Sequence, residues 1–228
     1  MWLLIYLLLL VVLVKSSVLY GRAFLLLLYG GFMHIFYIHG FLSGPNATKA
    51  NLLKDYVASL GDEKLYFDAL SFSDIPQHGF KNIIDKLDLF TAEYPNEEIA
   101  LVGSSLGGFY ATLLCERYGC RCVLLNPCIH PQDYFIKLAG PHYNEHTQCH
   151  FAVDEAMLEF LTALDKSIKL RCDLIEVYLG SQDEVLDHHK ALNFYRDCTI
   201  HFIEGEDHAF THDFKALMPK IVSYLTAN

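Results

Sequence analysis

The stretch that decides the fold of this chain is Glu98–Gly108, with the sequence EIALVGSSLGG. Its apolar first half predicts a buried β-strand, and the segment that follows, Leu106–Tyr118, predicts a helix. The residues between them form a G-x-S-x-G motif, in which Gly103 and Gly107 flank Ser105. Glycines at these positions allow the close backbone approach of a sharp strand-to-helix turn. The motif therefore predicts a nucleophile elbow, with the Ser105 hydroxyl pushed out of the sheet at the positive end of a helix.

Around this motif, short apolar runs alternate with longer amphipathic stretches from Met33 onward. This rhythm predicts a mostly parallel sheet with helices on both faces. The predicted strands are Ile35–Ile38, Lys64–Ala69, Glu98–Val102, Cys122–Leu125, Asp173–Leu179 and Thr199–Ile203. The other predicted helices are Ala47–Leu60, Gly79–Tyr94, His188–Tyr195 and Asp213–Leu225. A nucleophile elbow in such a sheet indicates the α/β-hydrolase fold.

A serine hydroxyl is a poor nucleophile without a base, and in this fold an acid and then a histidine follow the serine along the chain. His208, just past the last predicted strand, is the expected base. Asp183, in the loop after the preceding strand, is the expected acid that orients the imidazole, with Glu184 and Asp187 as alternatives. The competing histidines are His188, His189, His201 and His212.

The oxyanion hole of such a site needs two backbone N–H groups. One is expected from Leu106, directly after the nucleophile, and the other from the loop after the first strand, where Phe41 is the candidate. His39, at the start of that loop, is expected to stabilise the loop rather than to act as a base, because the base comes last in chain order.

One stretch, Asn126–Ser167, breaks the alternating rhythm. It is rich in Pro, His and Tyr and predicts only one helix, at about Asp154–Leu164. An insertion here would cover the catalytic edge of the sheet, and with Phe41 and Phe109 it is expected to form the mouth of an apolar pocket for short acyl groups. Four of its side chains offer metal-ligating atoms, but zinc sites usually have tighter paired spacing, so an ordinary covering loop is favoured. These four are His142, His146, Cys149 and His150.

Five segments of the chain together resemble the YqiA-type esterases, which are small α/β-hydrolases. They are His39–Pro45 (HGFLSGP), Gly103–Gly108 (GSSLGG), Leu125–Pro127 (LNP), Gly180–Asp187 (GSQDEVLD) and Gly205–Phe210 (GEDHAF). The resemblance covers Met33 to about Leu225. It implies activity on acyl esters, with acyl-CoA thioesters as a further class, and no metal or organic cofactor. It also implies a start at Met33.

The residues before Met33 depart from that pattern. Trp2–Val14 is an apolar run of 13 residues and Ala23–Tyr29 is a second run, and neither reaches the roughly 20 residues that span a bilayer. Lys15 follows the first run, whereas a signal peptide carries its positive charge in front. The favoured interpretation is a domain of residues 33–228 preceded by a translated spacer, 1–32; the alternative is a membrane anchor.

Net charge and cysteine content limit which partners and which cellular compartment are expected. The net charge of −10 is spread along the chain, which argues against a nucleic-acid partner, since such proteins gather Lys and Arg. The seven cysteines are odd in number and irregularly spaced, so no disulfide framework is predicted. Cys115, Cys172 and Cys198 lie in apolar segments and are expected to be free core thiols. Free thiols suit a reducing compartment, so the expected location is the cytoplasm.

These observations predict a serine esterase or thioesterase that cleaves short-to-medium acyl esters, including acyl-CoA, through an acyl-enzyme. The expected partner is a small acyl ester or thioester, and a membrane only if residues 1–32 are an anchor. Two other interpretations stay open, namely a non-catalytic α/β-hydrolase-like binding module and a membrane-anchored lipid hydrolase. A peptidase or lactonase on the same fold cannot be separated by sequence, since one triad serves many acyl chemistries.

Overall fold

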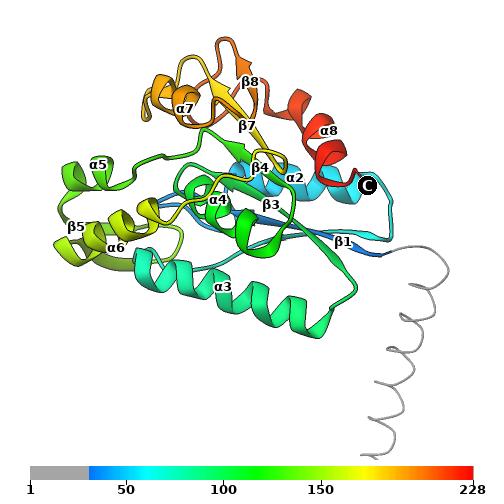
Figure 1. Cartoon of the computed structure of the whole chain (residues 1–228), viewed down its shortest axis with the longest axis horizontal. Helices are drawn as coiled ribbons and strands as arrows, with labels where there is room; N and C mark the ends of the chain where they lie inside the picture. Colours follow the sequence, from blue (N-terminus) through cyan, green and yellow to red (C-terminus); the bar gives the residue numbers. More distant parts are fainter. Residues whose placement is uncertain (1–30, 228) are drawn as a thin grey trace, which may run out of the picture.

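The computed structural model describes residues 31–227, and a single parallel sheet forms its centre (Figure 1). The sheet has six strands in the order β2-β1-β3-β4-β7-β8, and every neighbouring pair is parallel. The strands are β1 (Met33–Ile38), β2 (Leu65–Ala69), β3 (Glu98–Ser104), β4 (Cys122–Leu125), β7 (Ile175–Gly180) and β8 (Thr199–Ile203). The alternating pattern of the sequence thus forms the predicted sheet, and the α/β-hydrolase fold is confirmed.

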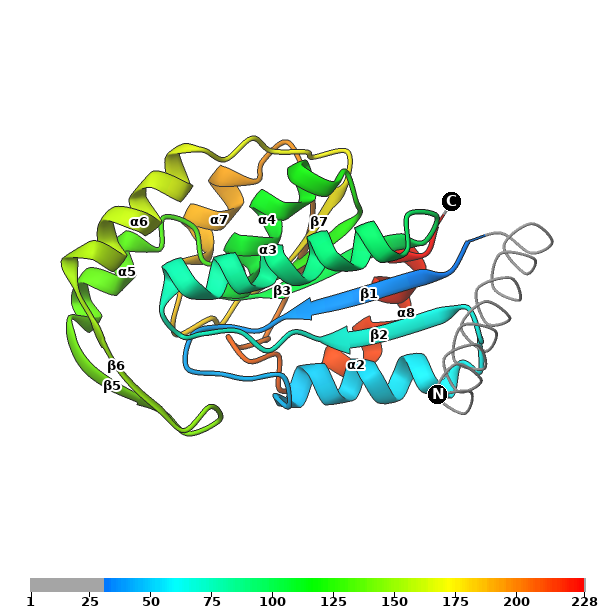
Figure 2. The same cartoon turned by 90° about the horizontal axis from the view of Figure 1, so that it is seen from below.

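Helices cover both faces of the sheet, as Figure 2 shows. On one face lie α2 (Thr48–Ser59) and α8 (Phe214–Leu225), which bury apolar side chains against the inner strands. On the other face lie α3 (Pro76–Glu93), α4 (Leu106–Tyr118), α6 (Glu155–Lys166) and α7 (His188–Phe194). The two faces form two separate hydrophobic clusters, which is what a sheet buried on both sides requires.

The central strand β3 runs two residues further than the sequence predicted. Gly103 and Ser104 pair with Leu124 and Leu125 of β4, so the strand continues directly into the motif. Helix α4 then begins at Leu106 and ends at Tyr118; Gly119 follows with a left-handed φ of 60°, and its N–H donates to the Cys115 carbonyl at 2.9 Å. The strand-turn-helix context that the motif needs is therefore present.

The insertion is more ordered than the sequence predicted. Besides α6 it contains α5 (Gln132–Phe135), a short 3-10 turn (Ile136–Leu138) and an antiparallel hairpin of β5 (Gly140–Asn144) and β6 (Cys149–Val153). The side chain of Asp154 accepts a hydrogen bond from Met157 N at 2.9 Å and so caps α6. Figure 2 shows the hairpin beyond the ends toward which the arrows of β1 and β2 point. The insertion therefore lies at the carboxyl edge of the sheet.

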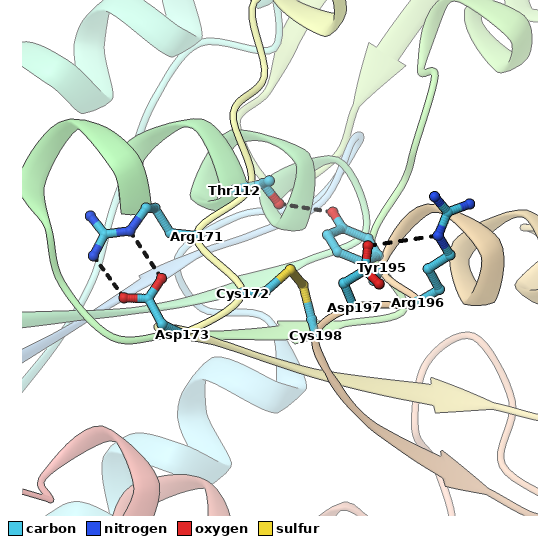
Figure 3. The surroundings of a disulfide bond; sticks show 8 residues. All are labelled: Thr112, Arg171, Cys172, Asp173, Tyr195, Arg196, Asp197 and Cys198. Atoms are coloured by element: carbon cyan, nitrogen blue, oxygen red, sulfur yellow. Dashed lines mark hydrogen bonds and ion pairs between the residues drawn. A yellow bond between two sulfur atoms is a disulfide. The ribbon is translucent and has the colours of Figure 1, made fainter.

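One pair of cysteines overturns the prediction of free thiols. Cys172 and Cys198 form a disulfide with their Cα atoms 4.3 Å apart, although they are separated by 26 residues in sequence (Figure 3). Cys172 shortly precedes β7 and Cys198 directly precedes β8, and these strands pair in parallel, so their starting points lie side by side. The remaining cysteines are free, and only Cys149 among them is exposed.

The N-terminal segment predicted as a spacer or anchor falls, apart from its last two residues, outside the described residues. The division into residues 1–32 and 33–228 therefore stays a prediction. Within residues 31–227, no helix is both long enough and apolar enough to cross a membrane.

Candidate active site

Ser105 occupies the strained turn between β3 and α4. Its φ of 55° and ψ of −120° are unusual for a residue with a side chain, and such backbone strain concentrates at functional sites. Surrounding bonds hold the turn in place, since the Ser105 carbonyl accepts hydrogen bonds from Gly108 N and Cys128 N, both at 2.9 Å. The predicted elbow therefore has the backbone conformation of a nucleophile turn.

The glycines of the motif are required by close packing. A Cβ on Gly107 would overlap the carbonyl oxygens of Ile38 and His39. A Cβ on Gly103 would lie 2.7 Å from Ala111 Cβ in the following helix. No rotamer change relieves a clash with backbone, so only glycine lets β3, α4 and the end of β1 approach this closely.

His208 and Asp183 come together from two loops that are adjacent in space. The imidazole Nδ1 of His208 lies 2.9 Å from Asp183 Oδ2 and 3.0 Å from Oδ1. The Asp183 side chain is only 2% exposed and also accepts hydrogen bonds from Val185 N and Leu186 N at 2.9 and 2.8 Å. Since Nδ1 faces the carboxylate, Nε2 is the nitrogen left for the substrate side, where His208 lines the same cavity as Ser105. The structure thus brings the three predicted residues to one edge of the sheet.

The alternative acids have other partners. Glu184 accepts a hydrogen bond from the backbone N–H of His208 at 3.1 Å, so it supports the loop rather than the imidazole. Asp187 caps α7 by accepting from His189 N at 3.0 Å. Both carboxylates therefore accept hydrogen bonds from backbone N–H groups near the predicted acid, and neither contacts the His208 imidazole.

The competing histidines also lie in structural settings. His201, in β8, contacts Glu176 Oε2 at 2.9 Å and Lys220 Nζ at 3.1 Å. His212 lies before α8, where its backbone N–H donates to buried Glu206. None of these histidines lines the cavity that holds Ser105.

Asn126, at the end of β4, is a supporting residue that sequence reasoning did not assign a role. It is 1% exposed and has a positive φ of 42°. Its Oδ1 accepts from Gly180 N at 2.8 Å, and its Nδ2 donates to the carbonyls of Asp207 and His208 at 3.0 and 3.2 Å. The Asn126 side chain thus connects the loop that precedes Asp183 with the loop that carries His208.

The two predicted oxyanion donors border the Ser105 hydroxyl. A Cβ on Gly40 would lie 3.6 Å from Ser105 Oγ, so the loop after β1 passes directly beside the hydroxyl, and Phe41 follows in that loop. Leu106 is the first residue of α4. Within residues 31–227, neither amide donates a hydrogen bond to another protein group, which leaves both N–H groups for a ligand.

His39 is buried behind this loop rather than in the cavity. Its ring stacks on Phe72 with centroids 4.0 Å apart, and its Nδ1 donates to the Gly40 carbonyl at 2.9 Å. Burial lowers the pKa of the His39 imidazole and so favours the neutral form. These contacts match the expected loop-stabilising role.

A cavity of about 300 Å³ opens at Ser105. Its lining comes from the end of β1, the start of α2, the elbow, the insertion and the His208 loop: Tyr37, Gly40, Phe41, Ser43, Ala47, Thr48, Lys49, Ser104, Ser105, His146, His208 and Ala209. The expectation that Phe109 borders the mouth is wrong. Phe109 is 1% exposed and lies one helical turn beyond Ser105 on the core side of α4, against Tyr110.

The hairpin of the insertion is fastened over this cavity by buried Asn144. Its Nδ2 donates to Ser43 O at 3.0 Å and to Asp74 Oδ1 at 2.6 Å, and Thr147 Oγ1 donates to the other Asp74 oxygen at 2.8 Å. The Asn144 Oδ1 accepts from His146 N, which sets that residue in the wall. The insertion therefore completes the cavity through contacts with the loops after β1 and β2.

The histidines and Cys149 of the insertion do not form a metal-ligating cluster in the described part of the chain. The ring of His142 instead packs near Phe41 and Phe151, and its Nε2 contacts the Leu138 carbonyl at 2.6 Å. This is the behaviour of a covering segment.

This sheet order and this strand-turn-helix elbow define the α/β-hydrolase fold. Known structures agree: Est1E from Butyrivibrio proteoclasticus, solved with ferulic acid bound, is 12% identical with a TM-score of 0.65, over 87% of this chain and 91% of that one. Mouse α/β hydrolase domain-containing protein 10 is 15% identical with a TM-score of 0.59, over 83% and 88%. An α/β serine hydrolase without a lid from Xanthomonas campestris is 12% identical with a TM-score of 0.58, over 86% and 84%.

At these identities the likeness establishes the fold alone. The chain belongs to the uncharacterised protein family UPF0227, whose model matches residues 34–226. This match confirms the resemblance to the YqiA-type family found in the sequence.

Proposed function

We propose that this protein is a serine esterase that hydrolyses small acyl esters, with Ser105 as nucleophile, His208 as base and Asp183 as the orienting acid. The observation that carries the proposal is the hydrogen-bonded Asp183–His208 pair, partly buried beside a cavity that also contains the strained Ser105 turn. In a catalytic triad, the carboxylate orients the imidazole that takes the proton of the serine, whereas a protein that only binds its ligand does not need this arrangement.

In the proposed mechanism, His208 Nε2 takes the proton of Ser105 Oγ as the oxygen attacks the ester carbonyl. The amides of Leu106 and Phe41 stabilise the resulting oxyanion. The protonated imidazole then gives its proton to the leaving alcohol, and the acyl group stays on Ser105. Water, activated by His208, releases the acid and restores the hydroxyl. Asp183 keeps the imidazole in the required tautomer and stabilises its charge throughout.

The size of the cavity supports a short acyl group. About 300 Å³ is at the lower end of ligand pockets, and Tyr37 and Phe41 give it an apolar part. The ferulic acid bound by Est1E, a carboxylic acid, is in keeping with an acyl substrate on this fold. Thioesters such as acyl-CoA belong to the same proposal because the acyl-enzyme chemistry is shared.

A cytoplasmic location also belongs to the proposal, but the free and the disulfide-bonded cysteines favour different compartments. The buried free thiols, among them Cys115 and Cys122, suit a reducing compartment, whereas the disulfide Cys172–Cys198 is of a kind that persists in oxidising ones. Fractionation of cells that express the full-length chain, followed by detection in cytoplasmic, membrane and exported fractions, decides between them.

The proposal is tested on the full chain with Ser105→Ala and, as a matched control, Ser223→Ala at an exposed position of α8. We expect hydrolysis of 4-nitrophenyl esters that declines with acyl length. We expect Ser105→Ala to lose roughly a thousand-fold or more in kcat/KM, and Ser223→Ala to match the parent.

A second measurement separates narrow specificity from absence of catalysis. A fluorophosphonate probe should add one phosphonyl group to the parent and to Ser223→Ala, seen by intact mass, and none to Ser105→Ala. A folded parent that neither hydrolyses any ester nor reacts with the probe would refute the proposal in favour of a binding module.

A further inference from the structure

Among residues 31–227, one lysine, Lys49, lines the cavity that holds the proposed nucleophile and base. Lys49 is the second residue of α2, and its side chain lines the cavity with Ser105 and His208. Its Nζ donates to the Ala209 carbonyl at 2.9 Å and lies 5.9 Å from the centroid of the Phe210 ring. The ammonium is therefore partly buried at the wall where a substrate must enter.

The carboxylates nearest this ammonium already have other partners. Asp207, Asp183 and Glu206 all act electrostatically on Lys49. Asp183 is held by His208, and Asp207 accepts from Thr211. Glu206 accepts from the amides of His212 and Asp213. In the described range 31–227, no carboxylate forms an ion pair with Lys49.

Among the described residues, the rest of the cavity wall contains no acidic side chain. The other titratable side chains that face the cavity are His146, His208 and Tyr37, none of which supplies a carboxylate. Helix α2 begins beside the cavity at Thr48; the preceding residue, Ala47, offers no side-chain cap, and the first turn has no acidic residue. The amide dipoles of that turn thus add to the positive potential of the ammonium.

A neutral donor would satisfy the Ala209 carbonyl equally well. The hydrogen bond to this carbonyl therefore does not explain why Lys49, a charged residue, lies here. A cation taken partly out of water costs free energy unless an anion compensates it. Burial lowers the pKa of Lys49 to about 8, and the group is still protonated at neutral pH. A charged donor with free N–H groups in a substrate cavity is suited to an anion that arrives with the substrate.

We propose that the Lys49 ammonium binds a negatively charged group of the substrate, so that the enzyme prefers esters bearing a carboxylate or phosphate near the scissile carbonyl. This inference rests on the proposed function. Because the cavity is small, the anion and the ester lie within one short molecule. Lys49 would then determine substrate specificity, while Ser105 and His208 perform the chemistry.

The test compares matched neutral and anionic esters on the full chain, with acid release followed at constant pH. Ethyl pentanoate against monoethyl glutarate places the charge on the acyl half. Butyl acetate against 3-acetoxypropanoate places a carboxylate on the alcohol half, and 2-acetoxyethyl phosphate replaces it by a phosphate. The pair with the largest anionic preference identifies the half and the kind of anion.

The variants are Lys49→Met, Lys49→Arg and, as a control, Lys54→Met, which removes the same charge from an exposed position of the same helix. For the preferred pair, the ratio of anionic to neutral kcat/KM should fall by about ten-fold or more in Lys49→Met, as expected for the loss of about 1.4 kcal/mol of ionic interaction. Lys49→Arg should keep most of the preference, and Lys54→Met all of it.

A binding measurement keeps the inference separate from the proposed function. Glutarate is titrated into Ser105→Ala, with and without Lys49→Met, and binding is followed by calorimetry. Weaker binding in the double variant supports the inference even if no ester is hydrolysed, in which case only the proposed function fails. An equal fall in kcat/KM for neutral and anionic esters, together with equal glutarate binding, would overturn the inference and leave Lys49 as a fastener of the Ala209 loop.

Discussion

Replacing Asn126 by Ala tests whether one side chain holds the proposed acid and base in place. Asn126 is buried and bonds to Gly180, Asp207 and His208. The substitution leaves the buried Gly180 N–H without a partner, which costs about 1–3 kcal/mol. The two carbonyls lose donors, at about 1 kcal/mol each. Alanine is also less tolerant than asparagine of the φ of 42°, at roughly 1 kcal/mol.

The sum, on the order of 4–6 kcal/mol, is a large part of the 5–15 kcal/mol that stabilises a typical domain. Guanidinium unfolding followed by circular dichroism should show this loss. Asn51→Ala is the matched control, because Asn51 forms one exposed bond, to Asn46 O at 2.8 Å, and should change stability by less than about 0.5 kcal/mol. The proposed esterase activity, measured on the folded fraction of Asn126→Ala, should also fall, since the His208 loop loses the bonds from Asn126.

A free energy of unfolding for Asn126→Ala within about 1 kcal/mol of the parent would refute this reasoning. It would mean that the two loops are held by their other contacts, such as the bond from Gln182 N to the Glu206 carbonyl at 2.9 Å. Asn126→Asp offers a second reading of the same site. It keeps the acceptor for Gly180 and tolerates the backbone, but it sets an oxygen against two carbonyls, so its loss should also exceed that of the control.

Four further predictions follow from the site and the cysteines. Asp183→Asn should lower kcat/KM roughly a thousand-fold or more while the fold persists, because the Asn oxygen keeps the bonds from Val185 N and Leu186 N and its Nδ2 then donates to His208 Nδ1, which holds the imidazole in the wrong tautomer; activity near that of the parent would contradict it. The ratio of kcat/KM for anionic esters to kcat/KM for neutral esters should stay level from about pH 6 to 7 and fall as pH rises through the Lys49 pKa of about 8, since the ammonium is mostly charged only below that pH. A ratio that stays constant to about pH 10 would show that the charge of Lys49 does not cause the preference. In denaturant, five thiols should react before reduction and seven after it, and Cys149 alone should react quickly in the native protein; seven thiols before reduction would exclude the disulfide. Gly107→Ala should yield little folded protein on expression, because its Cβ meets backbone of β1; a folded, active variant would contradict it.

The sheet and the elbow could be predicted because their signals are local. The apolar runs of β1, β3 and β4 are continuous, as strands buried on both faces require. The order of serine, acid and base along the chain then indicated Asp183 and His208 without knowledge of contacts.

The remaining features depend on contacts between distant segments. The hairpin β5–β6 was missed because GPHYN and CHFAV show no clean alternation of apolar and polar residues. The disulfide was missed because only the parallel register of β7 and β8 brings Cys172 beside Cys198. Asn126 lies in the LNP segment of the family resemblance and Lys49 in a predicted helix, but neither position indicates a bonding partner, and only the tertiary structure shows what these side chains touch.

The hydrogen bonds of Asn144 have a consequence for the kinetics of the proposed reaction. They join the hairpin tip to the loops after β1 and β2, so the wall of the cavity is assembled before any ligand arrives. A reaction chamber that needs no closing step gives product from the first turnover, without a lag that depends on substrate concentration. It also lets acid and alcohol leave by the path along which the ester came. New substrate preferences could then arise by exchanging residues at the hairpin tip while the sheet stays unchanged.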